Sequence, residues 1–246
     1  MEDRPSSSEP SSASTVPRTR SAAFFDVDGT LVPGAAIWKG IWAYHFAKKR
    51  RRDRPIRFFL SNIGRWGLYK AGMLGRDRFY AAWGEGLAVL FQGLTLEEGR
   101  DIFVWVWENS LCPSLYEEVI AALRRHQEKG DLVVLVSATL QGLLEVLAQE
   151  LGADHVIGSR LELHDGHYTG RMAPPLCFGA HKALRVRELL ASTEPVDLSA
   201  SSAYADSGHD AALLELVGSP IAVNPDPALL TMAQRRGWPV IGTAKR

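Results

Sequence analysis

The sequence has little of what marks a secreted or membrane-spanning protein. Its 246 residues include two cysteines, Cys112 and Cys177, which show no metal-ligand spacing. We therefore expect free thiols in a reducing cytosol rather than disulfides. No apolar run reaches the roughly eighteen residues of a transmembrane helix, and the N-terminus lacks the apolar centre of a signal peptide. These absences favour a cytoplasmic location without a transmembrane segment.

An excess of charge of either sign is also absent. The chain has 28 basic and 28 acidic residues, so its formal net charge is zero. This balance does not suggest a nucleic-acid-binding protein. Hydrophobic residues make up 46% of the chain, which is enough for a sizeable core. The length suits one large domain, or a core domain that carries an insertion.

Two stretches differ in composition from the rest of the chain. Residues 1–20 are rich in Ser, Pro and charge, which is typical of a disordered tail. Residues 35–110 hold six of the seven tryptophans, with apolar residues at helical spacing. Between residues 35 and 94 there are twelve basic but three acidic residues. We interpret 35–110 as a helical cap packed over the strand ends, with Thr95 opening its last helix through a capping box.

The remainder alternates between strand and helix patterns, which predicts an α/β fold with a doubly wound, Rossmann-like parallel sheet. An Asp-Gly pair at residues 165–166 predicts a hairpin within 161–169. The expected helices span 115–129, 141–151, 179–190 and 211–217, and the expected strands span 22–25, 132–136, 154–158, 202–205, 221–223 and 239–241.

Two carboxylates, Asp26 and Asp28, follow the first apolar run and precede a glycine turn. Ligands of open α/β sheets bind beyond the carboxyl ends of the strands. Side chains two apart on a strand point the same way, so the two acids should lie side by side at the mouth of a crevice. Like charges resist sharing such a site unless a cation or a shared proton intervenes.

Other polar residues also follow strands or open helices: Ser137, Lys182, Asp206 and Asp210. Each alone has an ordinary structural interpretation, as a helix cap, a turn residue or a solvated lysine. Together, carboxylates suit Mg²⁺, a lysine attracts an anion, and a serine hydroxyl with the N–H groups after it can hold phosphoryl oxygens. This combination is typical of phosphoryl transfer.

Four segments carry a family resemblance: DVDGTLV, VLVSAT, the lysine of GAHKALRVREL, and ADSGHD. They resemble, in order and spacing, the four motifs of the haloacid dehalogenase superfamily of aspartate-nucleophile phosphatases. The resemblance covers about residues 22–242 and is greatest to the phosphoserine phosphatase-like subfamily IB. It implies a catalytic core of residues 21–34 and 111–246, with the helical cap at 35–110.

The resemblance also implies roles for single residues. Asp26 would be the nucleophile that forms an aspartyl-phosphate, and Asp28 the general acid and base, partly buried under the cap. Ser137 and Ala138 would bind phosphate, and Lys182 would pair with Asp26 and with the phosphoryl oxygens. Mg²⁺ would be held by Asp26, Asp206 and the Asp28 carbonyl, while Asp210 would hold water at the metal.

One departure from the family pattern concerns the substrate. Phosphoserine phosphatases have a glutamate shortly after the first motif that can pair with the serine ammonium, whereas residues 33–37 contain no acid. An unpaired buried ammonium is costly. We therefore expect a phosphate monoester other than free phosphoserine, either a small metabolite or a lipid-like compound with an apolar or additional anionic part.

Several alternatives stay open from the sequence. The same site could serve a phosphotransferase or mutase, or a catalytically silent protein that binds a phosphate ligand in a regulatory role. The basic run at residues 48–54, followed by residues 56–74, could contact an anionic membrane surface. It could equally be a solvated helix end beside ordinary core aromatics. The oligomeric state is not indicated by any pattern in the chain.

Overall fold

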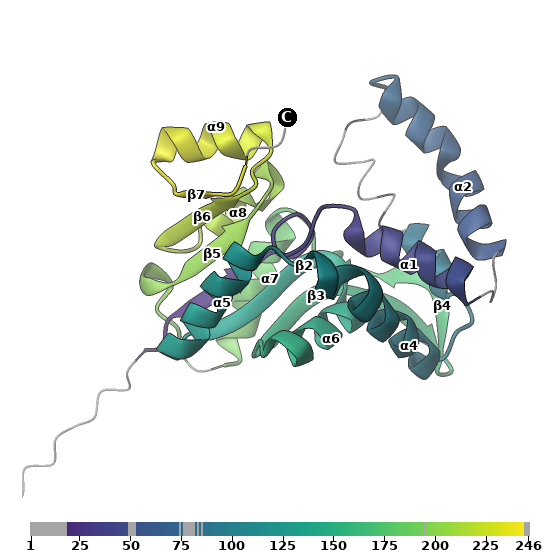
Figure 1. Ribbon diagram of the computed structural model, residues 1–246, viewed down its shortest axis with the longest axis horizontal. Helices are drawn as coiled ribbons and strands as arrows, with labels where there is room; N and C mark the ends of the chain where they lie inside the picture. Colours follow the sequence, from purple (N-terminus) through teal and green to yellow (C-terminus); the bar gives the residue numbers. More distant parts are fainter. Residues whose placement is uncertain are drawn as a thin grey trace, which may run out of the picture.

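The computed structural model describes residues 19–48, 53–73, 75, 82, 84, 86–193 and 195–243. Seven strands form one sheet in the order β4-β3-β2-β1-β5-β6-β7, in which β4 alone runs antiparallel to its neighbour. The predicted parallel, doubly wound sheet is therefore confirmed (Figure 1). The strands are β1 Ala22–Phe25, β2 Leu132–Leu140, β3 His155–His164, β4 His167–Ala173, β5 Ser202–Ala205, β6 Ser219–Val223 and β7 Val240–Ile241.

Strand β1 lies at the centre of the sheet, between β2 and β5. Its four side chains are all buried and alternate between two hydrophobic clusters. Ala23 and Phe25 belong to one cluster, whereas Ala22 and Phe24 belong to the other. A strand that is apolar on both faces in this way needs cover on both sides.

Helices provide that cover. Residues of α1, α4, α5 and α6 share the cluster of Phe25, and residues of α7, α8 and α9 share the cluster of Phe24. The bounds are α1 Ala36–Ala47, α2 Asp53–Lys70, α4 Leu96–Val106, α5 Glu117–Lys129, α6 Gln141–Leu151, α7 Ala180–Ala191, α8 Ala211–Leu214 and α9 Pro227–Arg236, with short turns η1 Ala88–Phe91, η2 Trp107–Leu111, η3 Cys112–Ser114, η4 Leu198–Ala200 and η5 Gly208–Asp210.

Helix ends follow the residue types expected from the sequence. The backbone N–H of Glu98 donates to the Thr95 hydroxyl oxygen, and the backbone N–H of Thr95 donates to the Glu98 carboxylate. This pair of hydrogen bonds confirms the predicted capping box of α4. Gly130 and Gly152 end α5 and α6 in the left-handed conformation. These caps explain why both helices end at the predicted residues.

Some predicted bounds differ from the structure. Strand β2 continues to Leu140 instead of ending at Val136, because its last residue pairs with Ser159 of β3 beyond a register shift. The predicted strand 154–158 and the first half of the hairpin form one strand, β3, whose outer half pairs with β4. The predicted helix 211–217 ends earlier, at Leu214.

The helical segment 35–110 is built onto one face and one edge of the sheet. Ile41 of α1 and Phe103 of α4 share the hydrophobic cluster of Phe25. The N–H of Gly93 donates to the Tyr168 carbonyl oxygen at 2.7 Å, and that of Tyr168 donates to the Leu94 carbonyl oxygen at 2.9 Å. The segment 35–110, called the insert from here on, is thus joined to β4 through backbone hydrogen bonds. The predicted domain boundaries between the insert and the core, at residues 34/35 and 110/111, stay a prediction.

Helix α2 stands away from the sheet (Figure 1). Its attached side carries the buried residues Arg54, Phe58 and Asn62. The guanidinium of Arg54 donates to the carbonyl oxygens of Leu90 and Gln92 beside η1. Within the described residues, no helix is long and apolar enough to cross a membrane.

The predicted N-terminal tail lies mainly outside the described residues, since the structure describes residues 19 and 20 of it. Arg20 forms an isolated bridge with Val196, and its side chain donates to the carbonyl oxygen of Gly130. The predicted basic run is described only at Lys48, Asp53 and Arg54.

Candidate active site

Asp26 directly follows β1, at the carboxyl end of the sheet. Its N–H donates to the Tyr204 carbonyl oxygen of β5 at 2.9 Å, which continues the parallel pairing by one residue. The side chain is buried, and both carboxylate oxygens have a donor. Thr30 Oγ1 donates to Oδ2 at 3.0 Å, and Lys182 Nζ donates to Oδ1 at 2.6 Å. Asp26 is therefore held in one orientation.

Thr30 was not identified from the sequence. It lies in the tight turn that follows Asp26, where Gly29 has a φ of 98° and the N–H groups of Thr30 and Leu31 return to the Val27 carbonyl oxygen. This turn brings the Thr30 hydroxyl back to Asp26. The available signal was a hydroxyl residue four positions after the acid, directly behind a glycine.

Lys182 lies in the first turn of α7 and is 3% exposed. Its Nζ lies 2.6 Å from Asp26 Oδ1 and 2.7 Å from Asp210 Oδ1. Burial alone would lower the pKa of Lys182, but the carboxylates of Asp210 and Asp26 outweigh burial and hold that pKa above its ordinary value. The lysine is therefore charged at neutral pH and joins two acids from different elements.

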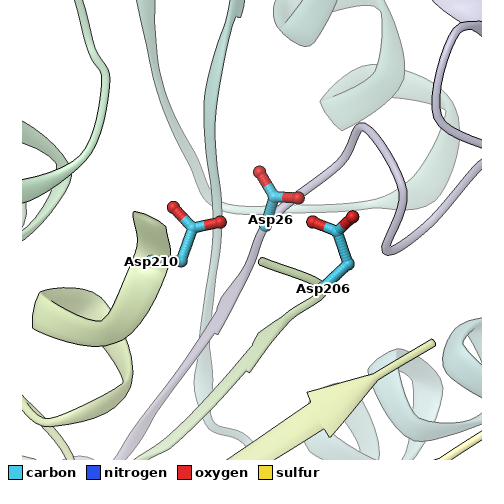
Figure 2. A group of neighbouring side chains, drawn as sticks. All are labelled: Asp26, Asp206 and Asp210. Carbon is cyan, nitrogen blue, oxygen red and sulfur yellow. The ribbon is translucent and has the colours of Figure 1, made fainter. Parts of the chain in front are cut away.

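Asp206 follows β5, and Asp210 lies immediately before α8. Figure 2 shows their carboxylates and that of Asp26 gathered around one space. One carboxylate oxygen from each of the three lies within 4.8 Å of the others, and all three residues are buried. Burial raises the pKa of Asp210, although the Lys182 ammonium acts against this rise. Three buried acids thus lie together, and Lys182 pairs with two of them, Asp26 and Asp210.

The chemistry of this cluster fits a divalent cation. All three side chains offer carboxylate oxygens, the ligands that Mg²⁺ prefers. Among the described contacts, Lys182 pairs with Asp26 and Asp210, and a divalent cation would neutralise further negative charge in this buried site. Asp26 and Asp206 are therefore able to hold the predicted Mg²⁺, with Asp210 beside them.

Asp28 is placed differently from the expectation. It is exposed rather than partly buried under the insert, and its side chain is not among the three clustered carboxylates, while the metal contact expected of its backbone carbonyl stays a prediction. Asp28 Oδ1 accepts the N–H of Ala35 at 3.1 Å. The physical reason is the turn after β1, which closes on itself through the N–H of Gly29 and the carbonyl oxygen of Val32 at 2.8 Å. This leaves the Asp28 side chain beside the entrance to the insert.

Ser137 lies on β2, whose register places Leu135 opposite Phe25 of β1. Ser137 and Asp26 therefore follow paired positions of neighbouring strands. The Ser137 hydroxyl is buried and accepts the Thr139 N–H at 3.2 Å, while Ala138 is exposed at this end of the sheet. The structure thus places both predicted phosphate-binding residues at the carboxyl edge that carries Asp26.

Asp226 is a second residue that sequence reasoning missed. Its N–H donates to the Asp206 carbonyl oxygen at 2.8 Å, and its carboxylate accepts the hydroxyl of Ser207 at 3.0 Å and the N–H of Gly208 at 3.3 Å. The same carboxylate caps α9 through the Leu229 N–H at 2.8 Å. Asp226 therefore fixes the turn that carries Asp206. An Asp-Pro pair at a helix start was the available signal.

Comparison with known proteins agrees with this geometry. The family described as haloacid dehalogenase-like hydrolase matches residues 23–215, which include every site residue named above except Asp226. The phosphoserine phosphatase SerB1 of Mycobacterium tuberculosis is 32% identical over 231 residues, covering 89% of this chain and 70% of that protein. A histidinol-phosphatase of Neisseria meningitidis is 34% identical over 225 residues, and the match covers 90% of this chain and 98% of that protein.

A solved structure is similar over the same length. The crystal structure of a protein of unknown function from Bordetella pertussis Tohama I has a TM-score of 0.76 and 31% sequence identity. The match covers 91% of this chain and 99% of the Bordetella chain. The family match and the two relatives named as phosphatases agree with one another. The chain belongs to the haloacid dehalogenase-like hydrolase family.

Proposed function

We propose that this protein is a Mg²⁺-dependent phosphatase that hydrolyses a small phosphate monoester through an aspartyl-phosphate on Asp26. The enzyme class, a phosphoric monoester hydrolase, is supported by the family and by relatives named as phosphatases. The observation that carries the proposal is the Asp26 carboxylate. Both its oxygens are oriented, by Lys182 and Thr30, within a group of three buried acids.

In the first step, the Asp26 carboxylate attacks phosphorus and the bond from phosphorus to the ester oxygen breaks. The departing oxygen takes a proton from the Asp28 carboxyl group. Lys182, the Ser137 hydroxyl and the Ala138 N–H hold the phosphoryl oxygens as negative charge moves between them. Because Asp26 is fixed before the substrate arrives, little reorientation is needed for attack.

In the second step, water attacks the phosphorus of the aspartyl-phosphate and passes a proton to the Asp28 carboxylate. Inorganic phosphate leaves, Asp26 regains its carboxylate, and Asp28 is protonated again for the next cycle. The exposed position of Asp28 suits this role, because it has to meet both the departing oxygen and the incoming water. Its bond from the Ala35 N–H would have to lengthen if the insert moves.

Asp26, Asp206 and the Asp28 carbonyl would hold Mg²⁺, with Asp210 beside Lys182. When bound, the ion supplies positive charge next to the transferred phosphoryl group. The chain's own contribution is to place acids from β1, β5 and the start of α8 around one space, as Figure 2 shows. Without the lysine, the same acids would repel one another more strongly.

The substrate is proposed to differ from free phosphoserine. Two phosphatase relatives of similar identity carry names with different substrates, so the shared fold does not select one. Residues 33–37, which follow the first motif, contain no acid to pair with a substrate ammonium. The neighbouring helix α1 instead carries aromatic and basic side chains, including a Lys39 ammonium 5.9 Å from the Trp38 ring centroid.

Hydrolysis of p-nitrophenyl phosphate tests the proposal. We expect Mg²⁺-dependent turnover that stops with EDTA and with Asp26→Asn. An acid quench with labelled phosphate ester should retain label on the wild type but not on that variant. Asp165→Asn is the matched control, because it makes the same chemical change at an exposed hairpin turn where asparagine tolerates a φ of 47°.

Full activity of Asp26→Asn would overturn the assignment. Transfer of phosphate to an added alcohol in preference to water would instead identify a phosphotransferase or mutase. Inactivity towards a panel of phosphate esters, together with measurable Mg²⁺ binding, would identify a silent ligand-binding protein. A panel that includes lysophospholipids and phosphorylated metabolites would also define the substrate class.

A further inference from the structure

Helix α2 has an outer face of large exposed apolar side chains. Relative exposure is 54% for Ile56, 46% for Phe59, 63% for Leu60, 46% for Ile63 and 49% for Trp66. Their spacing of three and four residues places them along one side of the helix. We call these five residues the α2 stripe. Large contiguous apolar surfaces of this kind are unusual on a protein that meets water alone.

The α2 stripe is not the side that attaches the helix. Phe58 is fully buried and lies edge-on to Trp42 of α1 at 5.8 Å between ring centroids, while Arg54 binds the backbone near η1. Phe59, the next residue, also meets the Trp42 ring at 6.4 Å between centroids, but its side chain is 46% exposed. Among the described residues, α2 therefore has one side that packs on residues 35–110 and an apolar side that is largely exposed.

Basic side chains are exposed on the same helix as the stripe. Arg57, Arg65 and Lys70 are exposed on α2, and the helix contains one acid, Asp53. The Lys70 ammonium lies 5.9 Å from the Trp66 ring centroid. A run of five bases at residues 48–52 precedes the helix, although the whole chain has zero net charge. The exposed apolar side thus belongs to a helix that carries three exposed bases and one acid.

We propose that α2 docks on an anionic membrane surface, lying in the plane of the interface with the α2 stripe among the lipid chains. Exposed aromatic and aliphatic residues beside arginine and lysine are the features of such interfacial helices. Anionic headgroups complement the bases, at about 1 kcal/mol for each basic residue near the surface. Eighteen residues give a helix of about 27 Å, long enough for several lipid contacts.

The basic side chains of α2 favour an anionic membrane over a second copy of the chain as the partner of the α2 stripe. Two α2 faces brought together would place like-charged arginines and lysines near one another, which disfavours pairing. An anionic membrane surface attracts these arginines and lysines instead of repelling them. A further step rests on the proposed function: a phosphatase held at a bilayer would act on a phosphate monoester carried by a lipid.

Co-sedimentation of the full chain with vesicles tests the docking. Vesicles would contain phosphatidylcholine alone, or phosphatidylcholine and phosphatidylglycerol in equal parts. We expect binding to the anionic vesicles at low salt and its loss at high salt. Arg57→Gln should weaken partitioning about fivefold, as the loss of one basic residue implies. Ile63→Ser should weaken it about tenfold or more through the lost apolar contact.

Leu68→Ser is the matched control, because Leu68 is exposed on the same helix but lies off the stripe. It should bind as the wild type does. All three variants should hydrolyse p-nitrophenyl phosphate normally, so a failure of docking is distinguishable from a failure of the phosphatase proposal. Absence of binding at low salt, or equal binding by Ile63→Ser and wild type, would overturn the proposal. So would a concentration-dependent dimer that Ile63→Ser dissociates, since a second copy would then cover the stripe.

Discussion

At the carboxyl ends of β1 and β5, charged side chains are buried, whereas on the outer side of α2 large apolar side chains are exposed. Lys182 is 3% exposed between two acids, while Leu60 is 63% exposed. Both arrangements reverse the usual distribution of polar and apolar residues, and such reversals are the informative ones. In the crevice the reversal strengthens electrostatic contacts with a ligand; on α2 it leaves a surface for a partner.

The two regions also differ in how their residues are fixed. Asp26 has a donor on each carboxylate oxygen, and the turn that carries Asp206 is bound by Asp226. The exposed side of α2 has no comparable network among the described residues. We therefore expect substitutions in the crevice to change stability and catalysis together, and substitutions on the α2 stripe to change only surface binding.

The largest effect is expected from Lys182→Met. Removal of the ammonium leaves Asp26 and Asp210 buried without their shared partner, which costs about 3–5 kcal/mol in the free energy of unfolding. Hydrolysis should also be lost. Denaturant titration with and without Mg²⁺ measures this, and the ion should restore part of the stability. Lys129→Met on the exposed end of α5 is the control. Equal stability of the two variants would contradict the buried pairing.

The next effect compares two neighbouring phenylalanines on α2. Phe58→Ala should lower the free energy of unfolding by about 3 kcal/mol, because the Phe58 ring is fully buried and its removal leaves a cavity. Phe59→Ala should cost less than about 1 kcal/mol, because its ring is 46% exposed. Denaturant midpoints of both variants measure the difference. Similar losses would show that the outer face of α2 is packed rather than exposed.

A smaller effect is expected from Thr30→Val, which removes the donor to Asp26 Oδ2 at nearly constant volume. Loss of a hydrogen bond to a charged group costs about 1.5–3 kcal/mol, and we expect part of this cost to raise the activation free energy of hydrolysis. We expect kcat to fall about tenfold with a smaller change in KM, and Thr30→Ser to restore it. If Thr30→Val left kcat unchanged, Lys182 alone would be sufficient to orient Asp26.

We expect a pH dependence from a buried chain of contacts beside β1 and β5. His126 Nδ1 lies 2.6 Å from Asp131 Oδ2, and its Nε2 lies 2.9 Å from the Tyr204 hydroxyl, while Phe25 stacks on the Tyr204 ring. Burial alone would raise the pKa of Asp131, but hydrogen bonds with His126 and Ser21 hold it below its ordinary value. A lowered pKa stabilises the fold above the ordinary value, and this stability is lost as pH falls through the lowered one.

Asp131→Asn should therefore lower the free energy of unfolding by about 1.5 kcal/mol at neutral pH, the low end for a hydrogen bond to a charged group, because the amide oxygen of asparagine still accepts hydrogen bonds. The difference from wild type should shrink below a pH of about 4, where the carboxyl of the unfolded chain becomes protonated. Urea titrations at several pH values measure it. A difference that stays constant across this range would show that the Asp131 charge contributes nothing.

Much of the fold was predictable because local rules and the tertiary structure agree. Four apolar residues predicted a strand buried on both faces, and Gly130 and Gly152 ended their helices as expected. The acids and the lysine of the crevice were predictable because strand ends meet at one edge of a parallel sheet. The pairing of Lys182 with Asp26 was expected from the family resemblance, whereas its second contact, with Asp210, was not predicted.

The rest depended on orientations that spacing does not reveal. Asp28 was expected under the insert, yet the turn after β1 leaves it exposed at Ala35. Thr30 reaches Asp26 only because that turn closes tightly. Phe58 and Phe59 are identical side chains on one amphipathic helix. Periodicity shows that they face different ways, but only packing decides which of them is buried.

The smallest effect on stability is expected from Ile63→Ser, at the centre of the α2 stripe. Its side chain is 46% exposed, so serine should change the free energy of unfolding by no more than about 0.5 kcal/mol, as for other exposed positions. Leu68→Ser should behave in the same way. A loss of 2 kcal/mol or more confined to Ile63→Ser would mean that another part of the chain covers the stripe in solution. Equal, small losses would leave the contrast intact: the crevice depends on its side chains to fold and react, and the α2 stripe is free to bind a surface.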